Sequence, residues 1–225
     1  MLPAPAAGPF DDPAYLFEPW WPGTRAIVFV EDGRVRLQAP ELADVLAAFP
    51  ELAGLAGRVA APDAILEGVV LVLDRAGRPD PALLRRRLED PGEHAGRPAF
   101  VAHDLLAASG RRLARLPFCE RRERLAALMR TADWCAVSRG YPGEGRTLAL
   151  AAADLGFRWL SAHRLDAPYR AGAAGDAWLR VPTAEVAANG PRSDDGRGAL
   201  AAAARFGEPR LPPILAVFRR LPLGD

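Results

Sequence analysis

The sequence contains no lysine, although it carries 29 basic residues, all of which are arginines. A lysine amine can lose its proton and attack an electrophile, whereas a guanidinium group stays charged and does not. Any mechanism that passes through a covalent lysyl intermediate is therefore closed to this chain.

Cysteine, net charge and long apolar runs are also scarce. Cys119 and Cys135 form no metal-binding or redox spacing, which is typical of a reduced cytoplasmic protein. The 29 basic and 28 acidic residues leave a net charge of +1, so a nucleic-acid site would have to be a local patch. No run approaches the roughly 18 apolar residues of a membrane span, so we expect a soluble protein.

The hydrophobic half of the 225 residues is arranged in short strands and helices. "AIVFV" (26–30) and "RVRLQA" (34–39) flank an Asp-Gly turn, which predicts a β-hairpin. The pattern as a whole predicts an α+β domain with largely antiparallel sheets flanked by helices. Further strands are expected at 64–74, 98–106, 134–139, 157–165 and 177–182, and helices at 40–57 (interrupted at Pro50), 81–88, 117–132 and 145–156. We interpret "RRR" (85–87) and "RRER" (121–124) as solvent-facing sides of helices.

Composition divides the chain into three parts. Residues 1–13 are rich in Ala and Pro and predict an irregular lead-in, and residues 14–182 form the expected domain. Residues 183–225 contain a polar, Gly-rich stretch and a short apolar segment, "PILAVFRRL" (213–221), and predict a linker and a short tail.

The stretch "EPWWPGTR" (18–25) places two tryptophans before a Pro-Gly turn. It resembles the opening motif of the adenylation domain of ATP-dependent DNA ligases, Glu-x-Lys-x-Asp-Gly-x-Arg. Glu18, Gly23 and Arg25 match, whereas Trp20 stands at the position of the lysine and Pro22 at that of the aspartate. The resemblance implies a ligase-type nucleotidyltransferase fold with ATP-grasp-like sheets.

The later motifs of the family follow in order. Phe49, Pro50 and Glu51 match its Phe-Pro-Glu sequence, and "LPFCERRERL" is similar to its Pro-Phe-x-Glu-Arg-Arg helix. In "LEGVVLVLD", Glu67 stands for the aspartate of Asp-Gly-Glu and Val69 for its metal-linked glutamate.

In the second half of the family's pattern, residue types change again. In "FVAHDLL", His103 replaces the aromatic residue that stacks on adenine and Asp104 is kept. "LSAHRLDAPYRAG" is similar to Val-Ala-Lys-Arg-x-x-x-x-Tyr-x-x-Gly, with His163 at the lysine position and Arg158 before it. "AWLRVP" keeps Trp178, has Arg180 for the first lysine of Trp-x-Lys-x-Lys and Pro182 for the second.

These departures predict a domain that has lost its catalysis. In the family, the first lysine attacks the α-phosphate of ATP and carboxylates hold Mg²⁺. Trp20 has no nucleophilic atom and Val69 cannot bind a metal, so we expect neither ATP nor Mg²⁺ as a cofactor, no catalytic residue and no metal site. We expect Trp20 to fill the former nucleotide pocket, or else to stack on a base or another flat ligand. The predicted pocket residues are Glu18, Trp20, Arg25, Glu67, Val69, His103, Asp104, Arg158, His163 and Arg180.

Five arginines in this region carry the expected DNA contacts. Such a cluster binds phosphates if it is unpaired, and is equally compatible with a solvated face crossed by ion pairs. The residues are Arg25, Arg158, Arg164, Arg170 and Arg180. The leading hypothesis is a pseudoenzyme that binds nicked or broken duplex DNA, or scaffolds a DNA repair or end-joining complex.

Two alternatives stay open at this point. One is residual nucleotidyltransferase or ligase activity through a substitute nucleophile such as His163 or His103, because imidazole can form a phosphoramidate. The other is a module that binds proteins alone. Ligases of the family also carry an OB-fold domain, and the 43 residues after Pro182 are too few to form one, so no OB-fold domain is expected.

Overall fold

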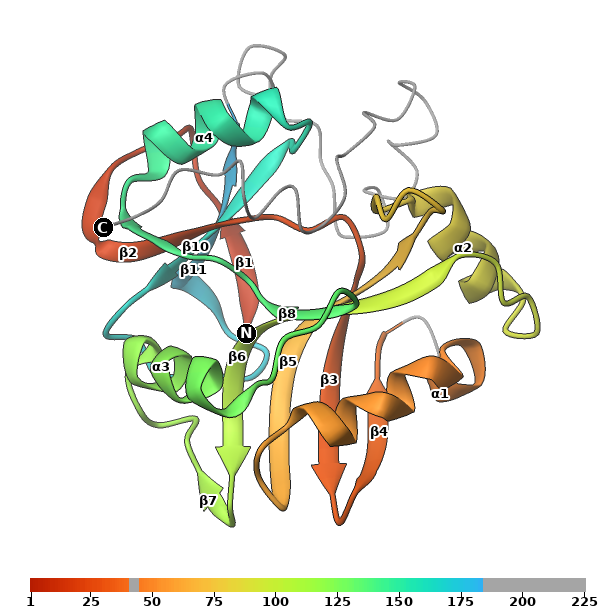
Figure 1. Ribbon diagram of the computed structural model, residues 1–225. Coiled ribbons are helices and arrows are strands. Elements are labelled where there is room, and N and C mark those ends of the chain that lie inside the picture. Colours follow the sequence, from red (N-terminus) through yellow and green to blue (C-terminus); the bar gives the residue numbers. More distant parts are fainter. Residues whose placement is uncertain (41–44, 184–225) are drawn as a thin grey trace. The chain divides into compact units, whose positions relative to one another are not determined.

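The computed structural model describes residues 1–40 and 45–183, drawn in colour in Figure 1. The described residues form two compact units. Unit 1 consists of Met1–Trp20 and the described residues from Ser138 onward, and unit 2 consists of Trp21–Val137. None of the helices in the described part is long and apolar enough to cross a membrane.

Unit 1 is built on a five-stranded sheet in the order β1-β11-β10-β2-β9. Its strands are β1 (Leu2–Pro5), β2 (Asp12–Pro19), β9 (Tyr141–Gly143), β10 (Trp159–Arg164) and β11 (Ala174–Pro182). Only the β1–β11 pair is parallel among the pairs of this sheet. Helix α4 (Gly145–Asp154) packs against β2 and β10 and buries Leu148 and Ala152 in the core of the unit.

Unit 2 is built on a second sheet in the order β4-β3-β5-β6-β7, with β8 paired to β6. Its strands are β3 (Thr24–Glu31), β4 (Arg34–Gln38), β5 (Asp63–Leu73), β6 (Arg97–Ala108), β7 (Arg111–Arg112) and β8 (Cys135–Val137). Its helices are α1 (Val45–Ala48), the 3-10 helix η1 (Pro50–Arg58), α2 (Pro81–Glu89) and α3 (Phe118–Leu128). In Figure 1, η1 and α3 cover the same face of this sheet.

Local chemistry explains several of these boundaries. Asp32 and Gly33 adopt φ values of 47° and 75°, the left-handed conformation that a tight hairpin between β3 and β4 requires. At the start of α2, the Asp80 carboxylate accepts hydrogen bonds from the backbone N–H groups of Ala82 (2.9 Å) and Leu83 (3.0 Å). Pro81 occupies the first position of that helix, where no intrahelical donor is needed.

The expected fold class is confirmed, because both sheets are largely antiparallel and helices flank them. The prediction of an irregular lead-in over residues 1–13 was wrong, because Leu2–Pro5 form β1 and β2 begins at Asp12. The prolines of β1 are tolerated because β1 is an edge strand, where a missing N–H can face solvent. The predicted linker and tail from residue 184 onward lie outside the described residues.

Candidate functional site

One face of the unit 1 sheet collects most of the predicted pocket residues from this unit. β10 pairs with β2 and β11, and directly opposed residues of antiparallel strands project from the same face. Glu18, Ser161 and Arg180 are opposed in one row, and His163 is opposed to Trp178 in the next. We call this surface the β10 face and define it by Glu18, Trp20, Trp159, Ser161, His163, Trp178 and Arg180.

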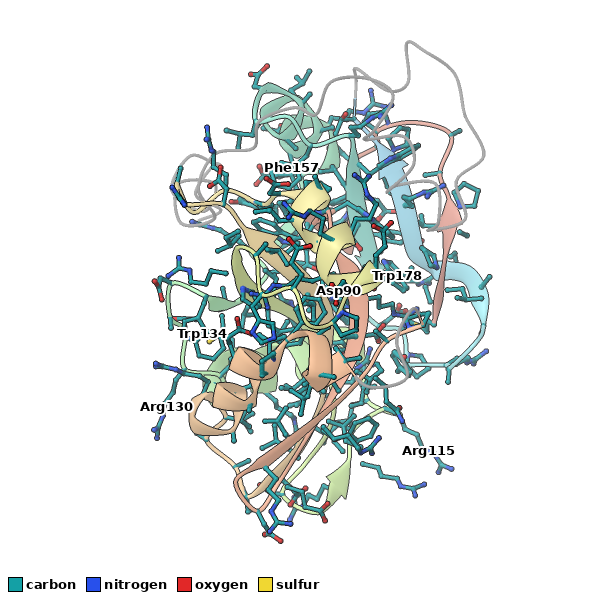
Figure 2. The ribbon with its side chains drawn as sticks, turned by 90° about the vertical axis from the view of Figure 1, so that its right-hand side faces the viewer. Asp90, Arg115, Arg130, Trp134, Phe157 and Trp178 are labelled. Carbon is teal, nitrogen blue, oxygen red and sulfur yellow. The ribbon has the colours of Figure 1, made fainter. Side chains whose placement is uncertain are left out.

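Aromatic rings stack on the β10 face. The Trp178 ring stacks on Trp20, with centroids 5.9 Å apart and planes 22° apart, and on His163, with values of 5.2 Å and 16°. Trp178, labelled in Figure 2, is 5% exposed, and His163 is 3% exposed. Trp178 Nε1 donates to Ser161 Oγ at 2.6 Å, and Ser161 Oγ is 2.9 Å from His163 Nε2. His163, which we predicted at a lysine position of the family, is therefore held in a stack and a hydrogen-bond chain.

Charged groups on the β10 face are also engaged. The Glu18 side chain is buried, and its Oε2 lies 3.7 Å from His163 Nε2. The Arg180 guanidinium lies over the Trp159 ring, 4.7 Å from its centroid, within the range of a cation–π contact. This arrangement resembles a packed core layer more than a polar cradle for phosphates.

Unit 2 holds a second group of predicted residues around Glu67. Glu67 is 1% exposed, forms an ion pair with Arg25, and lies 3.7 Å from His103 Nε2 through its Oε1. Burial raises the Glu67 pKa, but the neighbouring His103 and the charge of Arg25 outweigh it and lower the pKa to about 2. Val69, at the metal-linked position, faces Arg25 across the β3–β5 ladder. The Glu67 carboxylate is thus held by a histidine and an arginine.

Asp104 follows His103 on β6, and its carboxylate faces helix α3. Its two oxygens accept from Arg121 Nε and Nη2, each at 2.8 Å, and both side chains are buried. Asp104 Oδ1 also accepts from the backbone N–H of Leu105 at 2.7 Å. Asp104 therefore anchors α3 to the sheet, although we expected it in the nucleotide pocket beside His103.

Arg87 of α2 is a buried residue that the sequence reasoning missed. Its guanidinium binds both Glu51 oxygens, at 2.9 and 3.1 Å, and donates to the carbonyl oxygens of Ala48, Ala95 and Gly96 at 2.8 to 3.1 Å. Burial raises the pKa of Glu51, but the hydrogen bonds from Arg87 outweigh it and hold that pKa below its usual value. We expected "RRR" (85–87) and "RRER" (121–124) to face solvent, which is wrong for Arg87 and Arg121, both 0% exposed. No local signal in the sequence marked Arg87 as buried, because an arginine in a helix normally faces water.

The predicted phosphate-binding arginines differ in their partners. Arg164 forms ion pairs with Asp166 (2.8 Å) and Asp176 (2.7 Å), and Arg25 with Glu67. Arg158 and Arg170 are exposed in unit 1. Arg170 also lines a hollow of about 300 Å³ together with Arg164 and Trp178. Arg25 and Arg164 are thus held by carboxylates, and Arg158 and Arg170 are exposed to solvent.

A family model described as "ATP dependent DNA ligase domain" matches residues 8–140. The multifunctional non-homologous end joining DNA repair protein LigD of Mycobacterium tuberculosis is 31% identical over 185 residues, which cover 81% of this chain and 24% of that protein. A probable DNA ligase of Anaeromyxobacter sp. is 34% identical over 199 residues, which cover 83% of this chain and 38% of the relative. This chain therefore spans about a quarter of the LigD relative.

A solved structure also resembles this chain in its fold. A mycobacterial DNA ligase D complexed with ATP and MES superposes with a TM-score of 0.68 at 27% identity, covering 81% of this chain and 59% of that one. The predicted resemblance thus holds in sequence and in fold, and extends over both units.

Proposed function

Because this chain belongs to the ATP-dependent DNA ligase domain family, we propose that it binds nicked or broken duplex DNA without forming a lysyl-adenylate. The observation that carries the proposal is the absence of lysine from all 225 residues. Trp20, at the lysine position of the opening motif, has no atom that can attack phosphorus, and its ring is stacked on Trp178.

The residues at the family's metal and phosphate positions also fit Mg²⁺ and ATP poorly. Val69 carries no oxygen ligand, and the Glu67 carboxylate is held by Arg25 and His103. Within residues 1–40 and 45–183, no group of three or more His, Cys, Asp or Glu side chains is placed to hold a metal ion. These positions support a domain whose adenylation chemistry has been replaced by packing.

A substitute nucleophile is disfavoured by burial. His163 is 3% exposed, stacks on Trp178, and has Ser161 and Glu18 next to its Nε2. His103 is 9% exposed and lies beside Glu67. A nucleophile must approach the α-phosphorus in line with the leaving group, and neither imidazole is presented for that approach.

The proposed ligand is a DNA end or nick, and the proposed process is DNA repair. The support is the relationship to LigD, which is named as a non-homologous end joining DNA repair protein, together with exposed Arg158 and Arg170. Exposed arginine side chains can bind backbone phosphates through paired N–H groups. A role as a protein-binding scaffold is the second candidate and predicts no DNA affinity.

Fluorescence anisotropy with a labelled nicked duplex tests the binding part of the proposal. We expect tighter binding to the nicked than to the intact duplex, with an affinity that falls as salt rises. Arg170→Gln should weaken binding, while Arg115→Gln, the same charge change at an exposed residue of unit 2, serves as the matched control. An absence of binding at low salt would retire the DNA role and leave the scaffold.

Incubation with α-phosphate-labelled ATP and Mg²⁺ tests the catalytic part. We expect no acid-stable or base-stable label on the chain, because no lysine is available and both histidines at family motif positions, His103 and His163, are buried. A label that disappears in His163→Ala would instead establish residual nucleotidyl transfer.

A further inference from the structure

Two arginines of unit 2 lie side by side where η1 and α3 end. Val59 and Met129 form an antiparallel bridge, and the Arg130 N–H donates to the Arg58 carbonyl at 2.7 Å beside it. Val59 and Met129 are 6% and 5% exposed, so they project inward. Arg58 and Arg130 are therefore backbone neighbours beside this bridge, and Arg130 is exposed while Arg58 is half-buried.

This placement of two like charges is unfavourable unless something compensates it. Directly opposed residues have Cβ atoms about 5 Å apart, and like charges at such positions destabilise a sheet. Among the residues that the structure describes, no carboxylate lies within 4.0 Å of either guanidinium, and the nearby Asp133 is bound to Arg97 at 2.6 Å. An anion held between the two guanidinium groups would relieve the repulsion.

An aromatic ring lies next to the arginine pair. Trp134 is half-buried, and the Arg58 guanidinium carbon is 5.7 Å from the centroid of its ring. A Cβ atom at Gly54 would come within 3.4 Å of that ring, so glycine lets the indole lie close to η1. Figure 2 labels Trp134 and Arg130, which lie on the same side of unit 2. Arginine beside a partly accessible aromatic ring is a combination that holds single-stranded nucleic acids, with phosphates on the charges and a base on the ring.

We propose that Arg58, Arg130 and Trp134 form a binding site for single-stranded DNA, in which the arginine pair holds a phosphate and Trp134 stacks on the adjoining base. This inference rests on the proposed function, because broken duplexes present single-stranded overhangs. An acidic peptide would use the two charges and leave the ring without a role, so the ring favours a nucleic acid. The site shares no residue with the β10 face or with the group around Glu67.

Titration of the full chain with a fluorescein-labelled thymidine 12-mer tests the site. We expect Arg58→Gln and Arg130→Gln each to weaken binding several-fold, and each to lower the slope of log affinity against log salt by about 0.7. Arg115→Gln is the matched control, because Arg115 is exposed and lies on the other side of unit 2 in Figure 2. Trp134→Leu should reduce both the affinity and the quenching of tryptophan fluorescence by the oligonucleotide.

Thermal melts without DNA distinguish a role of Arg130 in binding from a role in stability. Arg130→Gln should leave the melting temperature unchanged or raise it, because the substitution removes a repulsion. Binding of the 12-mer that does not respond to the three variants would overturn the inference, as would equal affinity for a polyglutamate peptide. Nicked-duplex binding that persists while the 12-mer fails to bind would overturn the inference and leave the proposed function standing.

Discussion

The β10 face of unit 1 and the ion pairs of unit 2 carry different motifs of the same family pattern, and they differ in which residue types are kept. In unit 2, the motif carboxylates of Glu51 and Asp104 are kept. Glu51 binds Arg87 and Asp104 binds Arg121, and both arginines are fully buried. In unit 1, the two lysine positions of the opening and later motifs carry Trp20 and His163, whose rings both stack on Trp178.

This contrast separates two kinds of motif residue: those that bind a partner within the fold and those that do not. A carboxylate that anchors a helix through a buried arginine cannot change alone, since its partner would be left as an uncompensated charge. A lysine that faces a nucleotide has no such partner in the fold and can be exchanged for an aromatic residue that packs. We therefore propose that the matching motifs preserve the scaffold and that the replaced positions mark where the chemistry has changed.

The largest expected effect is the loss of one partner of the Asp104–Arg121 pair. Arg121→Leu should lower the free energy of unfolding by about 3–5 kcal/mol, because it leaves Asp104 charged and buried. Urea denaturation followed by circular dichroism measures this loss. The double variant Arg121→Leu/Asp104→Leu should recover part of it, and a double variant as unstable as the single one would contradict the scaffold assignment.

Acid should remove the stability contributed by Glu67. Its pKa is about 2 in the folded chain against 4.5 for an unperturbed glutamate, so the contribution is complete above pH 4.5 and is lost as the pH falls from 4.5 toward 2. The size of this contribution is on the order of 3 kcal/mol. Urea midpoints measured from pH 6 to pH 3 should fall steeply for the wild type and less for Glu67→Gln. Parallel curves for the two proteins would show that Glu67 is not the group responsible.

The half-buried Trp20 should contribute less to the free energy of unfolding than the buried Trp178. Trp178→Ala should cost about 3 kcal/mol, because Trp178 is buried and donates to Ser161, whereas Trp20→Ala should cost about 1–2 kcal/mol. Thermal and urea denaturation compare the two. Equal losses would mean that Trp20 is packed as tightly as Trp178.

The sequence predicted the features that depend on local chemistry. The β3–β4 hairpin was predicted from the Asp-Gly turn, a helix was predicted at 81–88 where α2 lies, and the interruption at Pro50 follows from its missing N–H. β1 was missed because its pairing partner, β11, lies more than 160 residues away and its own residues include two prolines. Long-range pairing of this kind leaves no local pattern.

The sequence motifs predicted which residues of the site share a face of the sheet. Glu18, His163 and Arg180 were expected together, and the ladders of β10 place them on one face. The partners of the arginines were not predictable, because an arginine in a helix normally faces water, and only the folded chain shows Arg87 and Arg121 buried among carbonyls and carboxylates. The pocket assignment as a whole stays a prediction.

Returning the family's lysine gives the smallest expected effect and the sharpest test of the contrast. Trp20→Lys supplies a nucleophile at the position of the opening motif, yet we expect no labelling by α-phosphate-labelled ATP. The metal-linked position is still Val69, and the later lysine positions are still His163 and Arg180. The ligase domain of Mycobacterium tuberculosis LigD serves as the positive control, and Trp20→Lys/Val69→Glu tests whether a metal ligand is the missing part. Labelling of the single variant would mean that the β10 face still binds ATP and lacks only the lysine amine. The loss of chemistry would then be due to the one substitution at position 20.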